Sequence, residues 1–245
     1  MITKINKKIK NKYIMMKTGK PSRLVLIRHG ESISNKKKEN GFVPSFIKDE
    51  FMDMAAHNVK LTAEGMYQAV MTGRKIKEIY GSFDYIYTSP FARTRDTTTG
   101  ILSAYKEEKI QMQYRENLFI RERDAGYAFS MTENESNIAF PWLRQYWKVH
   151  GNFYSTPPGG ESIAKVAERV YQFIDMLLQR RGGQNVLIVT HGGTIRCFRY
   201  IIEHWSPEQA EVCNDEGSPI NCGVTTYTVD EQNKFVLQQY NQKYW

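Results

Sequence analysis

Leu24-Val25-Leu26-Ile27-Arg28-His29-Gly30-Glu31 is the stretch of this chain that is most informative about its fold and chemistry. Its four apolar residues are typical of a short strand that is buried on both faces. Ligands of open α/β sheets bind just outside the carboxyl ends of such strands, where Arg28 and His29 follow. A guanidinium beside an imidazole indicates a phosphate held next to a nucleophile. Gly30 is expected to let the backbone turn sharply and come close to this ligand.

A second apolar run, Val186-Leu187-Ile188-Val189-Thr190, ends in the same way, in His191-Gly192-Gly193. Two histidines far apart in the chain thus occupy equivalent strand-to-helix junctions. A lone histidine at a strand end is usually structural. The repetition of the same context, each histidine followed by glycine, favours one shared pocket.

Helices are predicted to alternate with the strands, which indicates an α/β protein, a three-layer α/β/α sandwich around a mostly parallel sheet with an antiparallel edge. The predicted helices cover residues 62–81, 91–105, 162–181 and 195–202, and the further strands cover 83–88, 110–114, 224–229 and 235–240. Residues 32–60 read as a long loop or lid, and residues 116–160 as loop-rich, with Trp142, Tyr146 and Trp147 on a short helix. Apolar positions from Met66 to Ile79 follow a helical period.

The charge of the chain is unevenly distributed. The 245 residues carry a formal net charge of +8, but residues 1–23 contain 8 of the 34 basic residues and no acidic one, which leaves 26 basic against 26 acidic residues. We therefore expect residues 1–22 to be a basic, flexible extension and residues 23–245 to be one domain. No nucleic-acid partner is expected for a neutral body, although the extension could touch nucleic acid or membranes electrostatically.

We expect a cytoplasmic protein, because the sequence shows neither a membrane span nor a secretory signal. No apolar run reaches ~18 residues, so no membrane span is expected. The N-terminus lacks the apolar segment and cleavage site of a secretory signal. The three cysteines, Cys197, Cys213 and Cys222, are an odd number without close pairing and suit free thiols in a reducing compartment.

A metal site is the main alternative to a phosphate site. His29, His191 and a carboxylate could form a three-ligand set. Arg28 argues against this, because its fixed charge would repel a dication. The segment Ser89-Pro90-Phe91-Ala92-Arg93 places a second arginine in the first turn of a helix, and helix N-termini attract anions. We therefore expect no metal.

The order of the motifs resembles the histidine phosphatase superfamily, in its phosphoglycerate-mutase-like branch. The resemblance extends from residue 23 to about residue 230. In chain order the matching motifs are Arg28-His29-Gly30-Glu31 with Asn35, Leu61-Thr62-Ala63-Glu64-Gly65 with Gln68, Ser89-Pro90-Phe91-Ala92-Arg93 with Thr97, Arg121-Glu122-Arg123-Asp124 with Gly126, Gly160-Glu161-Ser162, and His191-Gly192-Gly193.

The resemblance implies a role for each matching residue. His29 would be the nucleophile that becomes phosphohistidine, with its second ring nitrogen donating to a backbone carbonyl. Glu122 would be the general acid and then the base, with Asp124 as the alternative. The resemblance implies an activity that needs no metal, and we expect no cofactor. The residues expected to bind the phosphoryl group are Arg28, Asn35, Arg93, His191 and Gly192. Glu161 is expected to be mainly structural, and Ser162 to cap the helix that follows.

A phosphatase is favoured over a mutase. Residues 36–60 do not resemble the mutase segment, and only 38 residues separate Glu122 from Glu161, which leaves no room for the mutase insertion. We expect a metal-independent phosphomonoesterase acting on a small phosphorylated metabolite or another phosphomonoester. The alternatives are a phosphoglycerate-type mutase and a non-catalytic module that binds phosphorylated ligands.

Two sets of side chains could determine specificity. One is cationic and would bind a second anionic group: Lys36, Lys37, Lys38, Lys60 and Arg115. The other is aromatic and would form an apolar wall, although such side chains are more often core or lid packing: Tyr127, Phe129, Trp142 and Trp147.

Overall fold

A computed structural model of the chain describes residues 18–36, 54–107, 109–110, 112–129, 131, 133–212 and 219–245. Within these residues six strands form one sheet in the order β3-β2-β4-β1-β5-β6. The strands are β1 (Arg23–Arg28), β2 (Tyr85–Thr88), β3 (Tyr114–Glu116), β4 (Asn185–Thr190), β5 (Val224–Val229) and β6 (Phe235–Gln242). Residues 1–17 of the predicted extension and most of the predicted loop, residues 37–53, lie outside the described residues.

The sheet is mixed in the predicted way. Strands β1, β4, β2 and β3 are parallel to their neighbours, whereas β5 is antiparallel to β1 and β6 is antiparallel to β5. The mostly parallel sheet with an antiparallel edge is therefore confirmed. The closing hairpin is the pair β5 and β6.

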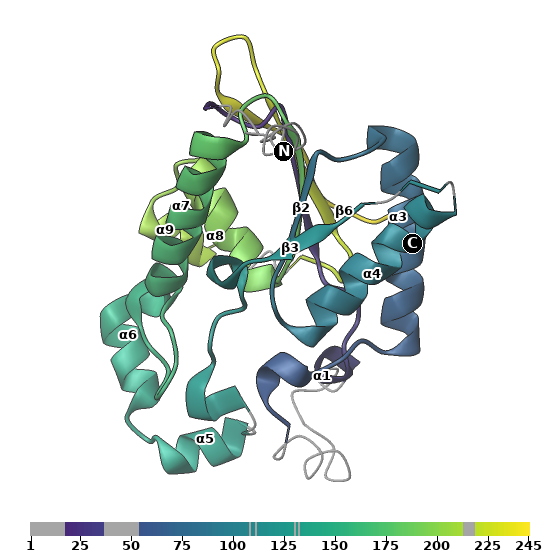
Figure 1. Ribbon diagram of the computed structural model, residues 1–245. Coiled ribbons are helices and arrows are strands. Elements are labelled where there is room, and N and C mark those ends of the chain that lie inside the picture. The colour runs from purple at the N-terminus through teal and green to yellow at the C-terminus, as the bar shows by residue number, and fades with distance from the viewer. Residues whose placement is uncertain are drawn as a thin grey trace, which may run out of the picture.

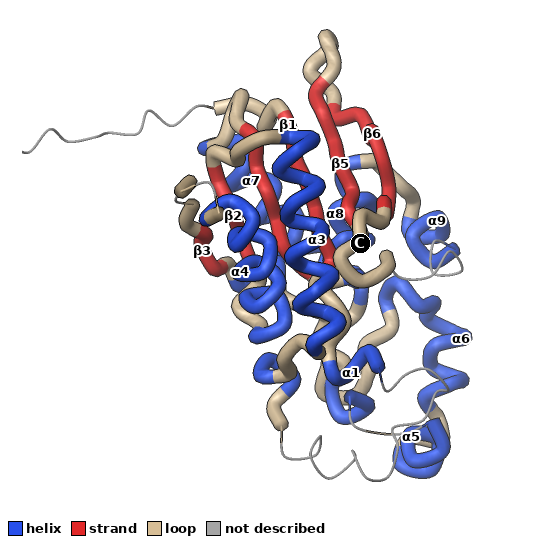
Figure 2. Tube along the Cα trace, turned by 90° about the vertical axis from the view of Figure 1, so that its right-hand side faces the viewer, coloured by secondary structure: helices blue, strands red, loops and turns tan. Residues whose placement is uncertain are grey.

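Helices cover both faces of the sheet, so the three-layer prediction is also confirmed (Figures 1 and 2). Helices α3 (Ala63–Tyr80) and α4 (Ala92–Lys106) lie on one face, and α7 (Ile163–Arg180) and α8 (Gly192–Ile202) lie on the other. The remaining elements are α1 (Ile33–Lys36), α5 (Glu133–Ala139), α6 (Leu143–Tyr154) and α9 (Pro207–Val212), with short 3₁₀ turns at η1 (Ala56–Asn58), η2 (Leu118–Ile120) and η3 (Gly126–Phe129).

The apolar run of β1 is explained by two separate cores. Leu24 and Leu26 pack into the core beneath α7 and α8, whereas Val25 and Ile27 pack into the core beneath α3 and α4. Successive side chains of a strand point to opposite faces, so a strand covered on both sides must be apolar at every position. Each such burial stabilises the fold by about 1.5–3 kcal/mol.

The helix over residues 62–81 forms as predicted, but only part of its predicted apolar face is buried, at Ala69 and Ile76. Met66 and Ile79 are 37% and 44% exposed. The buried positions are mainly small or polar: Gly65, Gln68, Ala69, Thr72, Gly73 and Ile76. A Cβ atom at Gly73 would lie 2.5 Å from the carbonyl oxygen of Ile101, so α3 and α4 approach too closely for larger side chains.

The strand predicted over residues 110–114 is wrong in position. Strand β3 is Tyr114–Glu116, paired with β2. Ile110 is instead part of the turn that ends α4, because its N–H donates to the carbonyl oxygen of Tyr105 at 3.1 Å. Ile110, a β-branched residue next to a helix end, was therefore wrongly assigned to the start of a strand.

Residues 116–160 contain more helix than expected. Tyr146 and Trp147 lie on α6, as predicted, and Trp142 immediately precedes that helix. Helix α5 was not predicted, and neither was α9, which lies outside these residues. They carry short, mostly polar sequences, whose helical period is weak.

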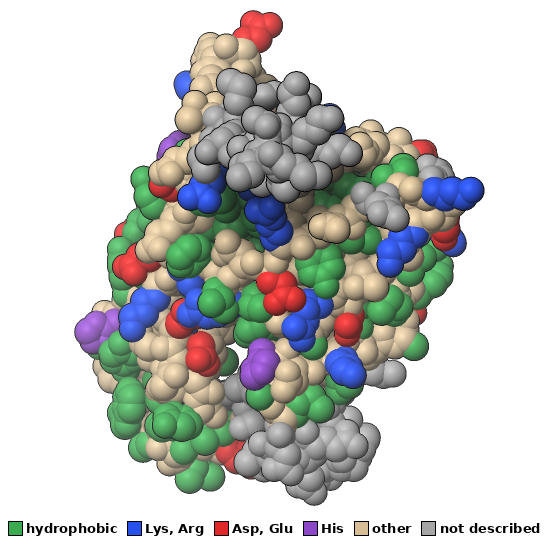
Figure 3. Space-filling view, in the orientation of Figure 1, with side chains coloured by type: hydrophobic (Ala, Val, Ile, Leu, Met, Phe, Trp, Pro, Cys, Tyr) green, Lys and Arg blue, Asp and Glu red, His purple; other side chains and the backbone are tan. Residues whose placement is uncertain are grey.

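On the face that Figure 3 shows, basic and acidic side chains are interspersed with apolar ones. None of the described helices is long and apolar enough to cross a membrane.

Candidate active site

The predicted site residues meet at one edge of the sheet. Strands β1, β2 and β4 are parallel, and their carboxyl ends lie side by side in register. His29 follows β1, Ser89 follows β2, and His191 follows β4. The ring centroids of His29 and His191 are 5.2 Å apart. The topology thus brings together the two strand-to-helix junctions that the sequence repeats.

His29 is held in one protonation state. Its Nδ1 lies 2.8 Å from the carbonyl oxygen of Gly30. A carbonyl can only accept a hydrogen bond, so Nδ1 carries the proton and Nε2 keeps its lone pair. Nε2 accepts a bond from Nε of Arg93 at 3.3 Å. Burial lowers the pKa of His29, and the charges of Arg93 and Arg28 lower it further. The result is a neutral imidazole with an unprotonated Nε2.

The glycine after this histidine is needed for packing. A Cβ atom at Gly30 would lie 2.4 Å from the carbonyl oxygen of Gly65, at the start of α3. A close approach between two backbone segments is therefore one reason for glycine at this position. Gly30 N–H also donates to Oγ1 of Thr97 at 3.0 Å, which ties the turn to α4.

His191 is fully buried beside the first histidine. Its Nε2 is 2.7 Å from Oγ of Ser89, and its Nδ1 is 3.8 Å from Oε2 of Glu122. Burial and the charge of Arg93 lower the pKa of His191. His191 is the N-cap of α8, which begins at Gly192. The first N–H groups of a helix lack intrahelical acceptors and attract anions, so this end of α8 adds positive potential.

Two arginines supply the fixed charge, the buried Arg93 and the half-buried Arg28. Nη1 of Arg28 donates to the carbonyl oxygen of Pro219, and Nη1 of Arg93 donates to that of Ala56 at 2.9 Å. Burial lowers the pKa of Arg93 to about 10, and the charge of Glu122 opposes this effect. A guanidinium with that pKa stays protonated at neutral pH. The site therefore combines two cations with two neutral imidazoles.

Asn35 is oriented by a residue that the sequence analysis missed. Its Oδ1 accepts hydrogen bonds from N and Oγ of Ser32, at 3.1 and 2.9 Å, and from Nδ2 of Asn221 at 3.1 Å. Because these donors occupy the oxygen, Nδ2 of Asn35 is the end that is available to donate to a ligand. Nδ2 of Asn221 also donates to the carbonyl oxygen of His29 at 3.1 Å. No local sequence pattern marks Asn221, which lies in a turn before β5.

Glu122 and Asp124 have different surroundings. Oε1 of Glu122 accepts the backbone N–H of Arg123 at 2.8 Å, while Oε2 faces the ring of His191. Asp124 is exposed, and its Oδ1 accepts the N–H of Gly126 at 2.8 Å, which stabilises a turn. The structure therefore places Glu122, rather than Asp124, beside the histidines.

Arg169 holds the segment that carries Glu122. This arginine of α7 is only 7% exposed. Its Nη1 donates to the carbonyl oxygens of Phe119 and Arg121 at 2.7 and 2.8 Å, and its Nη2 donates to that of Glu122 at 3.1 Å. A charged residue beside the buried face of a predicted amphipathic helix was the only sequence signal for this role.

Glu161 completes this support. It contacts Arg169 at 3.0 Å and Arg121 at 2.5 Å, and its Oε2 accepts the N–H of Asp124 at 3.1 Å. Burial raises the pKa of Glu161, but hydrogen bonds and the two arginine charges outweigh burial and lower it overall. Ser162 caps α7, as expected, by accepting the N–H of Lys165 at 3.1 Å.

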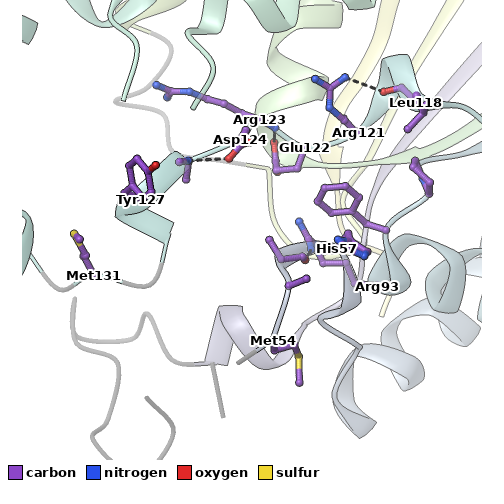
Figure 4. Close-up of a pocket in the computed structure, with 16 residues that line it drawn as sticks. Met54, His57, Arg93, Leu118, Arg121, Glu122, Arg123, Asp124, Tyr127 and Met131 are labelled. Carbon is purple, nitrogen blue, oxygen red and sulfur yellow. Dashed lines mark hydrogen bonds between the residues drawn. The ribbon is translucent and has the colours of Figure 1, made fainter. Parts of the chain in front are cut away.

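A cavity of about 850 Å³ opens in front of these groups. Figure 4 shows residues 118–127 along one side of it, with Met54, His57 and Arg93 opposite. The full lining is Met54, Ala55, Ala56, His57, Pro90, Phe91, Arg93, Leu118, Arg121, Glu122, Arg123, Asp124, Ala125, Gly126, Tyr127 and Met131. The cavity thus reaches the inner groups at Arg93 and Glu122.

Few of the predicted specificity residues line this cavity. Tyr127 does, whereas Trp142 and Trp147 are not among its lining residues. Lys60 and Arg115 are exposed and do not line it either. Lys37 and Lys38, and the side chains of Lys36 and Phe129, lie outside the described part of the chain.

Possible metal ligands and the cysteines Cys197 and Cys222 can be located in the described residues. In that part of the chain, no group of three or more His, Cys, Asp or Glu side chains gathers in a way that could hold an ion. The free thiols of Cys197 and Cys222 are buried, and Cys213 lies outside the described residues.

Comparison with known proteins agrees with this geometry. A model of the histidine phosphatase superfamily (branch 1) matches residues 24–243. A 2,3-bisphosphoglycerate-dependent phosphoglycerate mutase of Parvibaculum lavamentivorans is 29% identical over 223 residues, which cover 89% of this chain and 96% of the relative. A phosphoglycerate mutase-like protein of Arabidopsis thaliana is 30% identical over 221 residues, 81% of this chain and 63% of the relative.

Solved structures show the same fold. The alpha-ribazole phosphatase of Shigella flexneri superposes with a TM-score of 0.70 at 21% identity, over 90% of this chain and 96% of that protein.

Proposed function

The chain belongs to the histidine phosphatase superfamily, and we propose that it is a metal-independent phosphomonoesterase with His29 as nucleophile and Glu122 as proton donor. Catalysis through phosphohistidine is general for this family. The observation that carries the proposal is the neutral His29, whose Nε2 accepts a hydrogen bond from the buried Arg93, with the charge of Arg28 nearby and the carboxylate of Glu122 beside the adjacent His191.

The phosphoryl group of the substrate binds against the cationic end of the site. Arg28 and Arg93 neutralise the charge of its oxygens, and Nδ2 of Asn35 and the N–H of Gly192 donate hydrogen bonds to them. Nε of Arg28 and Nδ1 of His191 are buried polar atoms with no hydrogen-bond partner among the described residues. Leaving such atoms unpaired costs free energy, and phosphoryl oxygens would satisfy both.

Transfer then takes place in two steps. Nε2 of His29 attacks phosphorus, the N–P bond forms, and the ester P–O bond breaks while Glu122 gives its proton to the leaving oxygen. Glu122, now a carboxylate, takes a proton from water, and that water attacks phosphohistidine. The N–P bond breaks, and inorganic phosphate and free His29 result. The two arginines stabilise the charge of both transition states.

No metal is needed for these steps. The charge that a dication would supply comes from Arg28 and Arg93, and the repulsion between those guanidinium groups and a dication would weaken its binding. The same arrangement carried the sequence-based argument against a metal site.

A phosphoglycerate-type mutase is the second candidate, because the relative in Parvibaculum lavamentivorans is named as one. A mutase returns the phosphoryl group to a second hydroxyl instead of water. Interconversion of 2- and 3-phosphoglycerate that depends on a bisphosphoglycerate primer would support the mutase, whereas hydrolysis alone would count against it.

The test is hydrolysis of 4-nitrophenyl phosphate in the presence of a chelator, together with trapping of acid-labile phosphate on the protein. In His29→Gln we expect the label to disappear and kcat to fall by about 10³-fold or more. His150→Gln, at an exposed position on α6, is the matched control and should behave as the parent protein. Full activity of His29→Gln would contradict the proposal.

A further inference from the structure

The cavity in front of Arg93 and Glu122 has the chemistry of an apolar pocket. We propose that it binds the alcohol portion of the substrate, and that the preferred substrates are phosphomonoesters of apolar or aromatic alcohols. This inference rests on the proposed function and specifies its substrate class.

The alcohol portion of the substrate is expected to extend into this cavity, because it is attached to the ester oxygen that Glu122 protonates. Arg93 marks the phosphoryl end of the lining, and Glu122 must reach the ester oxygen to protonate it. The alcohol attached to that oxygen then extends past Glu122 into the remaining space. A volume of about 850 Å³ far exceeds what a phosphoryl group fills and matches cavities that hold drug-sized ligands, about 300–1,000 Å³.

The walls of this space are largely apolar. Phe91 packs against His191, with ring centroids 5.1 Å apart, and Met54 and Met131 also line the cavity (Figure 4). Leu118 and Tyr127 are each 67% exposed, although both are large apolar side chains. Apolar side chains that gather at the mouth of a cavity indicate a ligand that covers them.

The charged lining residues are engaged with protein groups. Arg121 is paired with Glu161, and Nε of Arg123 donates to the carbonyl oxygen of Glu161 at 2.7 Å. In Figure 4 the guanidinium groups of Arg121 and Arg123 are directed away from Arg93. The carboxylates of Glu122 and Asp124 remain along the same wall.

A second anionic group on the substrate is therefore disfavoured. It would lie near Glu122 and Asp124, while Arg121 is paired with the carboxylate of Glu161 and Arg123 donates Nε to the carbonyl oxygen of Glu161. An apolar group is not repelled by these carboxylates, and it is stabilised by contacts with Phe91 and Leu118. Each CH₂ that leaves water contributes about 0.8 kcal/mol.

The test compares esters whose alcohols are similarly poor leaving groups, so that differences report contacts with the alcohol. We expect kcat/KM for hexyl phosphate and 2-phenylethyl phosphate to exceed that for glycerol 3-phosphate and 3-phosphoglycerate by about tenfold or more.

Leu118→Ser tests the wall directly. It should lower kcat/KM for hexyl phosphate by about fivefold and change that for glycerol 3-phosphate less than twofold. Ile138→Ser is the matched control, because Ile138 is an 82% exposed apolar residue of α5 that does not line the cavity. It should leave both values unchanged.

The outcomes separate this inference from the proposed function. Equal or higher kcat/KM for glycerol 3-phosphate or 3-phosphoglycerate, with phosphohistidine formed, would overturn the substrate class alone. Equal losses for both esters in Leu118→Ser would overturn it as well. Failure to hydrolyse any ester, with no acid-labile phosphate on the protein, would overturn the proposed function.

Discussion

The two carboxylates near the site show how surroundings divide roles between similar side chains. Glu122 and Asp124 are two positions apart in a charged run, and the sequence left both as candidates for the acid. Glu122 faces His191, while Asp124 stabilises a turn through Gly126. A general acid must lie within reach of the leaving oxygen, so position decides here before pKa does.

Glu122→Gln and Asp124→Asn should differ in their effect on kcat. Glu122→Gln should lower kcat for an alkyl phosphate by about 10²–10⁴-fold, because the alkoxide then leaves without a proton. The loss should be much smaller for 4-nitrophenyl phosphate, whose leaving group needs little protonation. Steady-state kinetics on both esters measures the effect.

Asp124→Asn is the matched control for that variant. It keeps the turn-forming oxygen and should lower kcat by less than threefold. A larger loss in Asp124→Asn than in Glu122→Gln, on the alkyl ester, would assign the acid to Asp124.

Among the elements, α7 contributes more to the site than a wall of the core. Its Arg169 donates to the carbonyl oxygens of Phe119, Arg121 and Glu122, and Glu161 binds Arg121 and the N–H of Asp124. This segment has little regular structure of its own, so the position of Glu122 depends on a helix distant in sequence.

Removing that support should affect the proton-transfer step. We expect Arg169→Met to lower kcat for alkyl phosphates by about tenfold or more while changing 4-nitrophenyl phosphate hydrolysis much less. Because Glu161 would lose a buried partner, the free energy of unfolding should also fall, by about 3–5 kcal/mol. Kinetics and urea unfolding measure the two effects.

Arg180→Met, at an exposed position near the end of the same helix, is the control and should change neither quantity. Equal losses on both esters in Arg169→Met would show that Arg169 does not act through Glu122.

For the whole molecule, the two buried histidines of the site make the folded protein less stable at acid pH. His29 and His191 are buried beside Arg28 and Arg93. Burial is the main cause that lowers the pKa of each histidine, and the two arginine charges lower it further. In the unfolded chain a histidine has a pKa of about 6.5. Below that pH the unfolded chain binds more protons than the folded one, so acid favours unfolding.

The free energy of unfolding should therefore be highest above about pH 6.5 and fall as the pH decreases toward 5. Each histidine contributes a slope of up to about 1.4 kcal/mol per pH unit. Urea unfolding at a series of pH values measures this slope. It should be smaller in His191→Gln and unchanged in His150→Gln, and an identical slope in all three proteins would contradict the explanation.

Most of the sheet and its helices could be predicted, because buried parallel strands and amphipathic helices carry their period locally. The runs that became β1 and β4 and the caps at Thr62 and Ser162 were visible in a single chain. The prediction was wrong at residues 110–114, where one isoleucine closed a helix. It also missed the close packing of α3 on α4, which depends on Gly73 of α3 and on Gly100 of α4, where an added Cβ atom would lie 2.7 Å from that of Ala69.

The amino-acid sequence thus specified which chemical groups stand at the ends of the strands, including His29, Arg28 and His191, because each follows a locally recognisable strand. Folding specified how those groups are oriented. Asn221 fixes the amide of Asn35, Arg169 fixes Glu122, and the carbonyl of Gly30 fixes the tautomer of His29. Asn221 and Arg169 act across long sequence separations, which no local pattern encodes, so their roles are visible only in the assembled sheet and helices.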